Sequence, residues 1–127
     1  MSDLLMPHPA PVDTGHRPCW PLVIVDVEET RQLDATTVSL LVADMRARDE
    51  QGRAKYGVPL TAHNGRDHLA DAYQEALDGC VYLRAHIEEG FNGYLVADRA
   101  WDAYWAAVRH AHDLRSIIAM RDSEKAK

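Results

Sequence analysis

The sequence lacks the short motifs that mark several common kinds of active site. It holds no Gly-rich phosphate loop, no G-x-S-x-G nucleophile elbow, no H-E-x-x-H and no C-x-x-C pair, which removes the usual signatures of phosphate-loop, serine-nucleophile and zinc sites. Its two cysteines, Cys19 and Cys80, stand in unlike contexts. We therefore expect reduced thiols and no disulfide framework.

The chain also lacks long apolar runs and an excess of positive charge. No apolar stretch approaches the roughly 18–20 residues that span a bilayer, and no charged start followed by an apolar segment suggests a signal peptide. We therefore expect a cytoplasmic protein without a membrane partner. The formal net charge of −6 argues against general nucleic-acid binding. The charge does not argue against small phosphorylated ligands, because metal ions or a local basic patch can hold them.

At 127 residues the chain is long enough for one domain with a core. Prolines recur through residues 1–18, so we expect a flexible arm there. A single helical domain is expected over residues 19–122, followed by a frayed tail over residues 123–127. Trp20–Val27 is apolar and β-branched, which favours a short strand, and Phe91–Val96 is the only other strand-like segment.

Three segments show the 3- and 4-residue apolar spacing of helices, and they run over residues 34–51, 63–89 and about 98–121. Gly52 suits the end of the first helix, and Asp67 suits the N-cap or first turn of the second. These patterns predict an all-α fold, a bundle of about three main helices with a short N-terminal strand or extended arm. Because such helices leave broad apolar faces that one chain covers poorly, we expect a homo-oligomer to complete the bundle.

A polar stripe runs along the second predicted helix. Its members fall within a sector roughly 80° wide at about 100° per residue, and they are Asp67, Asp71, Glu75, Asp78 and Tyr82. Neighbouring carboxylates repel one another, so water, cationic side chains or a divalent metal must balance them. The stripe lies roughly opposite the apolar face of the same helix. It is therefore either a solvated surface or one half of a site that a second layer completes.

The first predicted helix offers a further carboxylate in an unusual place. Asp49 continues the apolar stripe, with Glu50 beside it, so the Asp49 side chain is either drawn inward or left in water where the helix frays. Cationic and aromatic side chains follow closely in the sequence. Arg53, Lys55 and Arg66 could either balance the carboxylates or hold phosphate oxygens. Tyr56 could either stack on a base or pack in the core.

This pair of acidic helices resembles the MazG-like all-α nucleoside triphosphate pyrophosphohydrolases. That family carries a Glu-rich pair on one helix and E-x-x-D on the next, and Glu75-Ala-Leu-Asp78 matches the second half. The R-x-K-Y-G and G-R-D segments are similar to those of small phage-encoded relatives, and the resemblance covers roughly residues 38–89. The family's E-E-x-x-E is absent, and the first helix offers only Asp44, Asp49 and Glu50 in its place.

The resemblance implies a metal-dependent hydrolase that converts a nucleoside triphosphate to its monophosphate and pyrophosphate. Glu75, Asp78 and Asp49 would then be catalytic. The ligands of a Mg²⁺ cofactor would be Asp49, Glu50, Asp71, Glu75 and Asp78. The substrate would contact Arg53, Lys55, Tyr56 and Arg66. If the chain is phage-encoded, the reaction would take place in the cytoplasm of the bacterial host.

The sequence leaves two other functions open. A non-catalytic nucleotide binder would use the cations and Tyr56 without metal, and it could sequester a nucleotide or a cyclic-nucleotide signal of host defence. A protein-interaction module would instead use the face of Trp101 and Trp105, in the third predicted helix, as its contact surface.

Overall fold

The computed structural model describes residues 3–5, 7, 10–90 and 93–127. These residues are mostly helical and form no β-strand, so the all-α prediction is confirmed for them. In chain order the elements are η1 (Asp3–Leu5, a 3₁₀ helix), α1 (Cys19–Glu29), α2 (Ala35–Tyr56), α3 (His68–Glu89) and α4 (Tyr94–Lys125). Each helix in this described part of the chain is too short or too polar to cross a lipid bilayer.

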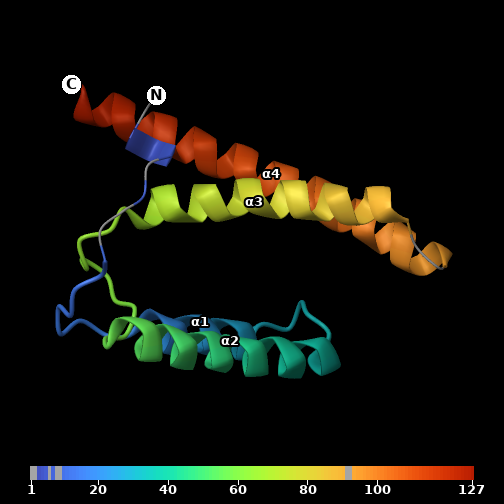
Figure 1. Ribbon diagram of the computed structural model, residues 1–127, viewed down its shortest axis with the longest axis horizontal. Helices are drawn as coiled ribbons and strands as arrows, with labels where there is room; N and C mark the ends of the chain where they lie inside the picture. The colour runs from blue at the N-terminus through green and yellow to red at the C-terminus, as the bar shows by residue number, and fades with distance from the viewer. Residues whose placement is uncertain (1–2, 6, 8–9, 91–92) are drawn as a thin grey trace. The chain divides into compact units, whose positions relative to one another are not determined.

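The chain divides into two compact units, each built around a pair of helices (Figure 1). The first unit comprises Met1–Pro7 and Asp67–Lys127, with α4 and η1 both packed on α3. The second unit comprises His8–Arg66, with α1 packed on α2. The expected single domain over residues 19–122 and the expected homo-oligomer stay predictions.

The strand predicted over Trp20–Val27 is wrong, because this segment lies inside α1. Trp20, Ile24 and Val27 recur at steps of four and three residues, which is the spacing of one helix face. Ile24 is buried and the other two are half-buried. Packing on α2 therefore outweighs the β-sheet preference of the Val and Ile residues, and a strand here would have no neighbour to pair with.

Helix α2 extends past its predicted end. Gly52 lies inside the helix, so the prediction that it ends the helix is wrong. The helix closes instead at Gly57, whose left-handed φ of 74° lets its N–H donate to the Arg53 carbonyl at 2.8 Å. At the other end the Asp34 carboxylate accepts hydrogen bonds from the N–H and the hydroxyl of Thr37, both at 2.8 Å.

The first unit is a long hairpin of α3 and α4. Its core holds Ala76 of α3 against Ala111 and Leu114 of α4, and the side chains packed around them are Leu69, Tyr73 and Cys80. The apolar face predicted for this helix is therefore confirmed in the main. Cys80 and Cys19 are both free thiols, as expected.

Helix α4 is longer at both ends than its predicted range. It begins at Tyr94, directly after Gly93, and it ends at Lys125, so it includes the first part of the predicted tail. The strand-like segment Phe91–Val96 falls partly outside the described residues, at positions 91 and 92, and its last three residues are helical.

Within residues 1–18, predicted to be a flexible arm, the described residues make specific contacts. In the first unit Gln74 Nε2 donates to the carbonyl oxygen of Leu4 at 2.6 Å, which ties η1 to α3. In the second unit the hydroxyls of Thr14 and Thr61 share a hydrogen bond at 3.0 Å. These contacts attach the described parts of the segment to the helical units.

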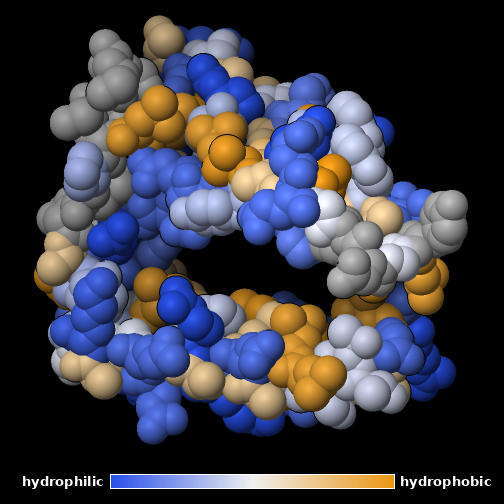
Figure 2. Space-filling view, turned by 45° about the vertical axis from the view of Figure 1, so that its right-hand side comes forward, coloured by the Kyte–Doolittle hydropathy of each residue, from blue (hydrophilic) through white to orange (hydrophobic). Residues whose placement is uncertain are grey.

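Large apolar side chains remain exposed on the helices of both units, and Figure 2 shows hydrophobic patches among the polar residues. Val81 of α3 is 60% exposed and Trp105 of α4 is 62% exposed. Trp101, the other tryptophan of the predicted contact surface, is also exposed. The two tryptophans therefore lie beside the core line of α4, which instead consists of Ala100, Ala111, Leu114 and Ile118.

Candidate functional site

The acidic stripe begins where α3 begins. Asp67 is the N-cap, as predicted, and its Oδ1 accepts the Ala70 N–H at 3.0 Å. Both carboxylate oxygens of Asp67 also accept from Nη1 of Arg121 at 3.0 Å, and this hydrogen bond raises the pKa of Arg121. Asp67 therefore has a structural role, because it holds the start of α3 to the last part of α4.

The other acids of the stripe point away from α4. Tyr73 and Cys80 pack toward the core with Ala76, and these positions lie roughly half a turn around the helix from Glu75 and Asp78. Glu75 and Asp78 are exposed, and Asp71 at the same face is half-buried. The predicted opposition of the acidic and apolar faces is confirmed, and α3 itself places Asp71, Glu75 and Asp78 on one side.

Asp49 and Glu50 lie in the C-terminal half of α2. The Asp49 side chain is 19% exposed and accepts from Nε of Arg53 at 2.9 Å, while Glu50 is exposed. The interpretation in which the helix frays before Asp49 is wrong, because α2 continues to Tyr56. Asp49 is drawn partly inward, as its place on the apolar stripe predicts, but it is neutralised by a cation of its own helix.

Three of the four predicted substrate contacts interact with a residue close by in the sequence. Arg53 pairs with Asp49, and Nζ of Lys55 lies 5.1 Å from the ring centroid of Tyr56. Tyr56 is exposed, so its ring is accessible to a stacking partner and is not the core residue of the alternative interpretation. Arg66 is half-buried just before α3.

The predicted site residues fall into two groups by unit. Asp71, Glu75 and Asp78 belong to the first unit, whereas the α2 carboxylates and all four substrate contacts belong to the second. Among the residues that the structure describes, no three His, Cys, Asp or Glu side chains form a group that could hold a metal ion. The meeting of the two groups in one site stays a prediction.

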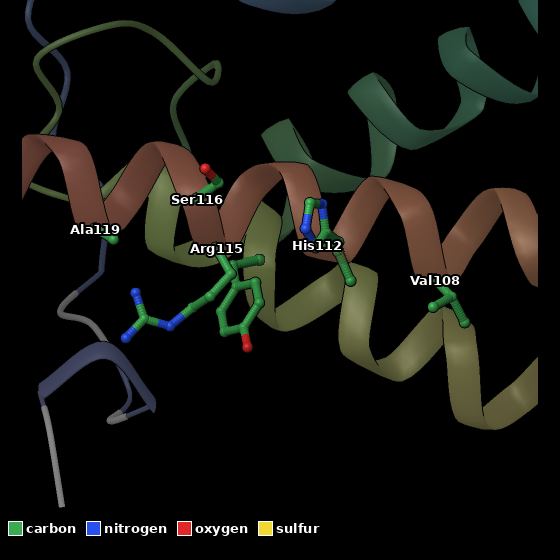
Figure 3. A pocket seen from close by; sticks show the side chains of 7 residues that line it. Val108, His112, Arg115, Ser116 and Ala119 are labelled. Atoms are coloured by element: carbon green, nitrogen blue, oxygen red, sulfur yellow. The ribbon is translucent and has the colours of Figure 1, made fainter.

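One concave surface was not predicted. A groove of about 620 Å³ runs along the α3–α4 hairpin, and it is lined by Tyr73, Val108, Ala111, His112, Arg115, Ser116 and Ala119. Figure 3 shows the Arg115 side chain extended from α4 toward the end of the groove where Ala119 lies. The helical spacing puts Arg115 on the same side as Val108 and Ala119. No sequence pattern reports whether the space between two helix flanks is open or filled.

No family model, curated protein or solved structure matches this chain. The membership in the MazG-like enzymes therefore stays a prediction from the residue pattern over residues 38–89.

Proposed function

We propose that this protein is a Mg²⁺-dependent nucleoside triphosphate pyrophosphohydrolase whose metal-binding surface includes the acidic face of α3. The observation that supports this proposal is the position of Glu75 and Asp78 on the side of α3 away from α4, with Asp71 one turn earlier. This donor set suits Mg²⁺, which prefers hard oxygen ligands. One or two carboxylates suffice for Mg²⁺ when substrate phosphates and waters complete the octahedron.

The reaction is a hydrolytic cleavage between the α and β phosphates. When bound, Mg²⁺ supplies charge neutralisation for the triphosphate and lowers the pKa of a coordinated water. Glu75 takes a proton from the attacking water as the water oxygen bonds to the α-phosphorus. The bond from that phosphorus to the oxygen bridging the β-phosphate breaks, so a nucleoside monophosphate and pyrophosphate are released. Asp78 would serve as a ligand of the ion.

The second unit carries predicted ligands of its own. Asp49 and Glu50 are carboxylates that suit a Mg²⁺ ion, and Lys55 and Arg66 suit phosphate oxygens. Tyr56 is exposed and suits stacking on the base. Because Asp49 is paired with Arg53 at 2.9 Å, its participation requires that this ion pair open or that Arg53 stay in place as a phosphate contact.

The test measures pyrophosphate release from a panel of nucleoside and deoxynucleoside triphosphates with Mg²⁺. We expect turnover that stops when EDTA is added, and a loss of about a hundredfold or more in Glu75→Gln, because a general base or metal ligand is removed. Glu89→Gln is the matched control, since Glu89 is exposed at the other end of the same helix. No turnover with any substrate, or equal turnover in the two variants, would refute the proposal.

We also propose that the chain forms a homo-oligomer. Exposed apolar side chains such as Val81, Leu95 and Trp105 support this, because their burial between two copies would stabilise an oligomer. Sedimentation at micromolar concentration should show a species heavier than 14.3 kDa. A stable monomer under those conditions would contradict the proposal.

A further inference from the structure

The groove along the α3–α4 hairpin has a chemical character unlike that of the whole chain. The chain carries a formal net charge of −6, yet among the described residues no Asp or Glu lines the groove, while Arg115 and His112 do. His112 Nδ1 lies 2.9 Å from the carboxylate of its neighbour Asp113. Arg115 makes no ion pair or hydrogen bond with any residue that the structure describes, so its guanidinium is available to an anionic ligand.

The groove also offers an ordered aromatic surface. Tyr73 is half-buried and packs against the core cluster of Ala76, Ala111 and Leu114, so its ring is fixed before any ligand arrives. The rest of the lining is largely apolar, with Val108, Ala111 and Ala119 contributed by α4. A volume of about 620 Å³ lies within the range of small-molecule sites, which combine apolar walls with a few polar groups.

These features define an occupant with one anionic end and one flat apolar end. A guanidinium presents a planar fork that matches phosphate oxygens, and a fixed tyrosine ring suits a base. We propose that this groove binds a nucleoside monophosphate, with the phosphate on Arg115 and the base against Tyr73.

The proposed groove site is separate from the acidic face. Tyr73 and Glu75 are two residues apart and so point to nearly opposite sides of α3. A monophosphate in the groove therefore cannot reach Glu75 and Asp78. Its role as a site for the reaction product rests on the proposed hydrolase, but binding in the groove needs no metal and no catalysis.

The experiment is calorimetric titration of the full chain with nucleoside monophosphates in EDTA. The four common monophosphates are compared with a nucleoside alone and with inorganic phosphate alone. We expect a monophosphate to bind, and both fragments to bind at least about tenfold more weakly, since each lacks one contact. Arg115→Gln should weaken monophosphate binding by about tenfold or more, because it removes a charge-assisted hydrogen bond.

Two further variants keep the result interpretable. Arg109→Gln removes an exposed arginine from another side of α4 and should leave binding unchanged. Ala119→Phe retains Arg115 but fills the groove, and it should also weaken binding. Absence of monophosphate binding, equal binding in Arg115→Gln and Arg109→Gln, or binding of inorganic phosphate as tight as that of the monophosphate would overturn the proposal.

The same titration separates this proposal from the hydrolase. Glu75→Gln should bind the monophosphate as the unaltered chain does, because Glu75 lies outside the groove. Groove binding without pyrophosphate release would sustain this inference and refute the hydrolase. Pyrophosphate release without groove binding would refute this inference and support the hydrolase.

Discussion

The carboxylate of Asp67 stabilises the first unit in two ways, so its replacement should be unusually costly for a half-exposed residue. Its Oδ1 caps α3 by accepting the Ala70 N–H, and both of its oxygens accept from Arg121, 54 positions later in the chain. Loss of an N-cap costs about 1 kcal/mol. The Asp67–Arg121 pair, with side chains 34% and 28% exposed, contributes about 0.5–1 kcal/mol after solvent screening.

Asp67→Ala should therefore lower the free energy of unfolding by about 1.5–2 kcal/mol. Asp67→Asn keeps an acceptor for the Ala70 N–H and loses only the charge, so it should cost about 0.5–1 kcal/mol. If all 127 residues unfold together, Asp67→Ala should lower the melting temperature by roughly 5.5–7.5 °C. Urea titration followed by far-ultraviolet circular dichroism measures both variants, with coincident probes to check two-state behaviour.

A double-mutant cycle isolates the ion pair. Asp67→Asn combined with Arg121→Gln should show a coupling of about 0.5–1 kcal/mol. Asp122→Asn is the control, because Asp122 also accepts from Arg121, at 3.1 Å, but is well exposed; its effect should stay within about 0.5 kcal/mol. A coupling of zero, or an Asp67→Asn variant as unstable as Asp67→Ala, would refute this account of how α3 is held.

Two further predictions concern α2. Gly57→Ala should destabilise the protein by about 1 kcal/mol, because Gly57 has a φ of 74°. Gly52→Ala should stabilise it by about 0.5–1 kcal/mol, because Gly52 is helical and an added Cβ meets nothing within 4 Å. Urea titration should show changes of opposite sign in the free energy of unfolding. The hydrogen bonds from Thr37 lower the pKa of Asp34 in the folded protein. The ionised Asp34 carboxylate therefore stabilises the fold above the ordinary Asp pKa of about 3.9, and this stabilisation is lost as pH falls through the lowered pKa. The unfolding midpoint of the unaltered chain should therefore fall more than that of Asp34→Asn between pH 7 and about pH 3, and parallel curves would contradict this reasoning.

The helices of the first unit could be predicted because local chemistry and packing agree there. Asp67 follows the turn residues His63 and Gly65, both of which adopt positive φ values, and the apolar spacing after Asp67 continues without interruption to Ile87. The same spacing fixed the acidic stripe opposite the core. Each of these features depends on residues a few positions apart.

Predictions failed where a local preference conflicted with packing. Trp20–Val27 has the composition of a strand but the spacing of a helix face, and contact with α2 decided between them. A glycine such as Gly52 can also lie inside a helix, and α2 continues through it. The helix ends at Gly57, which adopts a left-handed conformation.

The candidate site was predictable only as single residues on single helices. Asp71, Glu75 and Asp78 share a face because α3 is continuous, and periodicity reports that directly. The Arg53–Asp49 pair follows from i,i+4 spacing and could have been predicted in the same way. The groove around Arg115 depends on the separation of two helix flanks, and no spacing within one helix carries that information.

The packing of α3 on α4 sets the rotation of α3 about its own axis. The direction of Glu75 and Asp78 is therefore decided by residues on the opposite side of the helix. A one-residue slip in the interlocking of Ala76 with Ala111 and Leu114 would swing every side chain of α3 by about 100°. Substitutions buried in that contact can therefore alter chemistry at the surface without touching it. Natural variation at Ala76 should accordingly be narrow, even though its own side chain is only a methyl group.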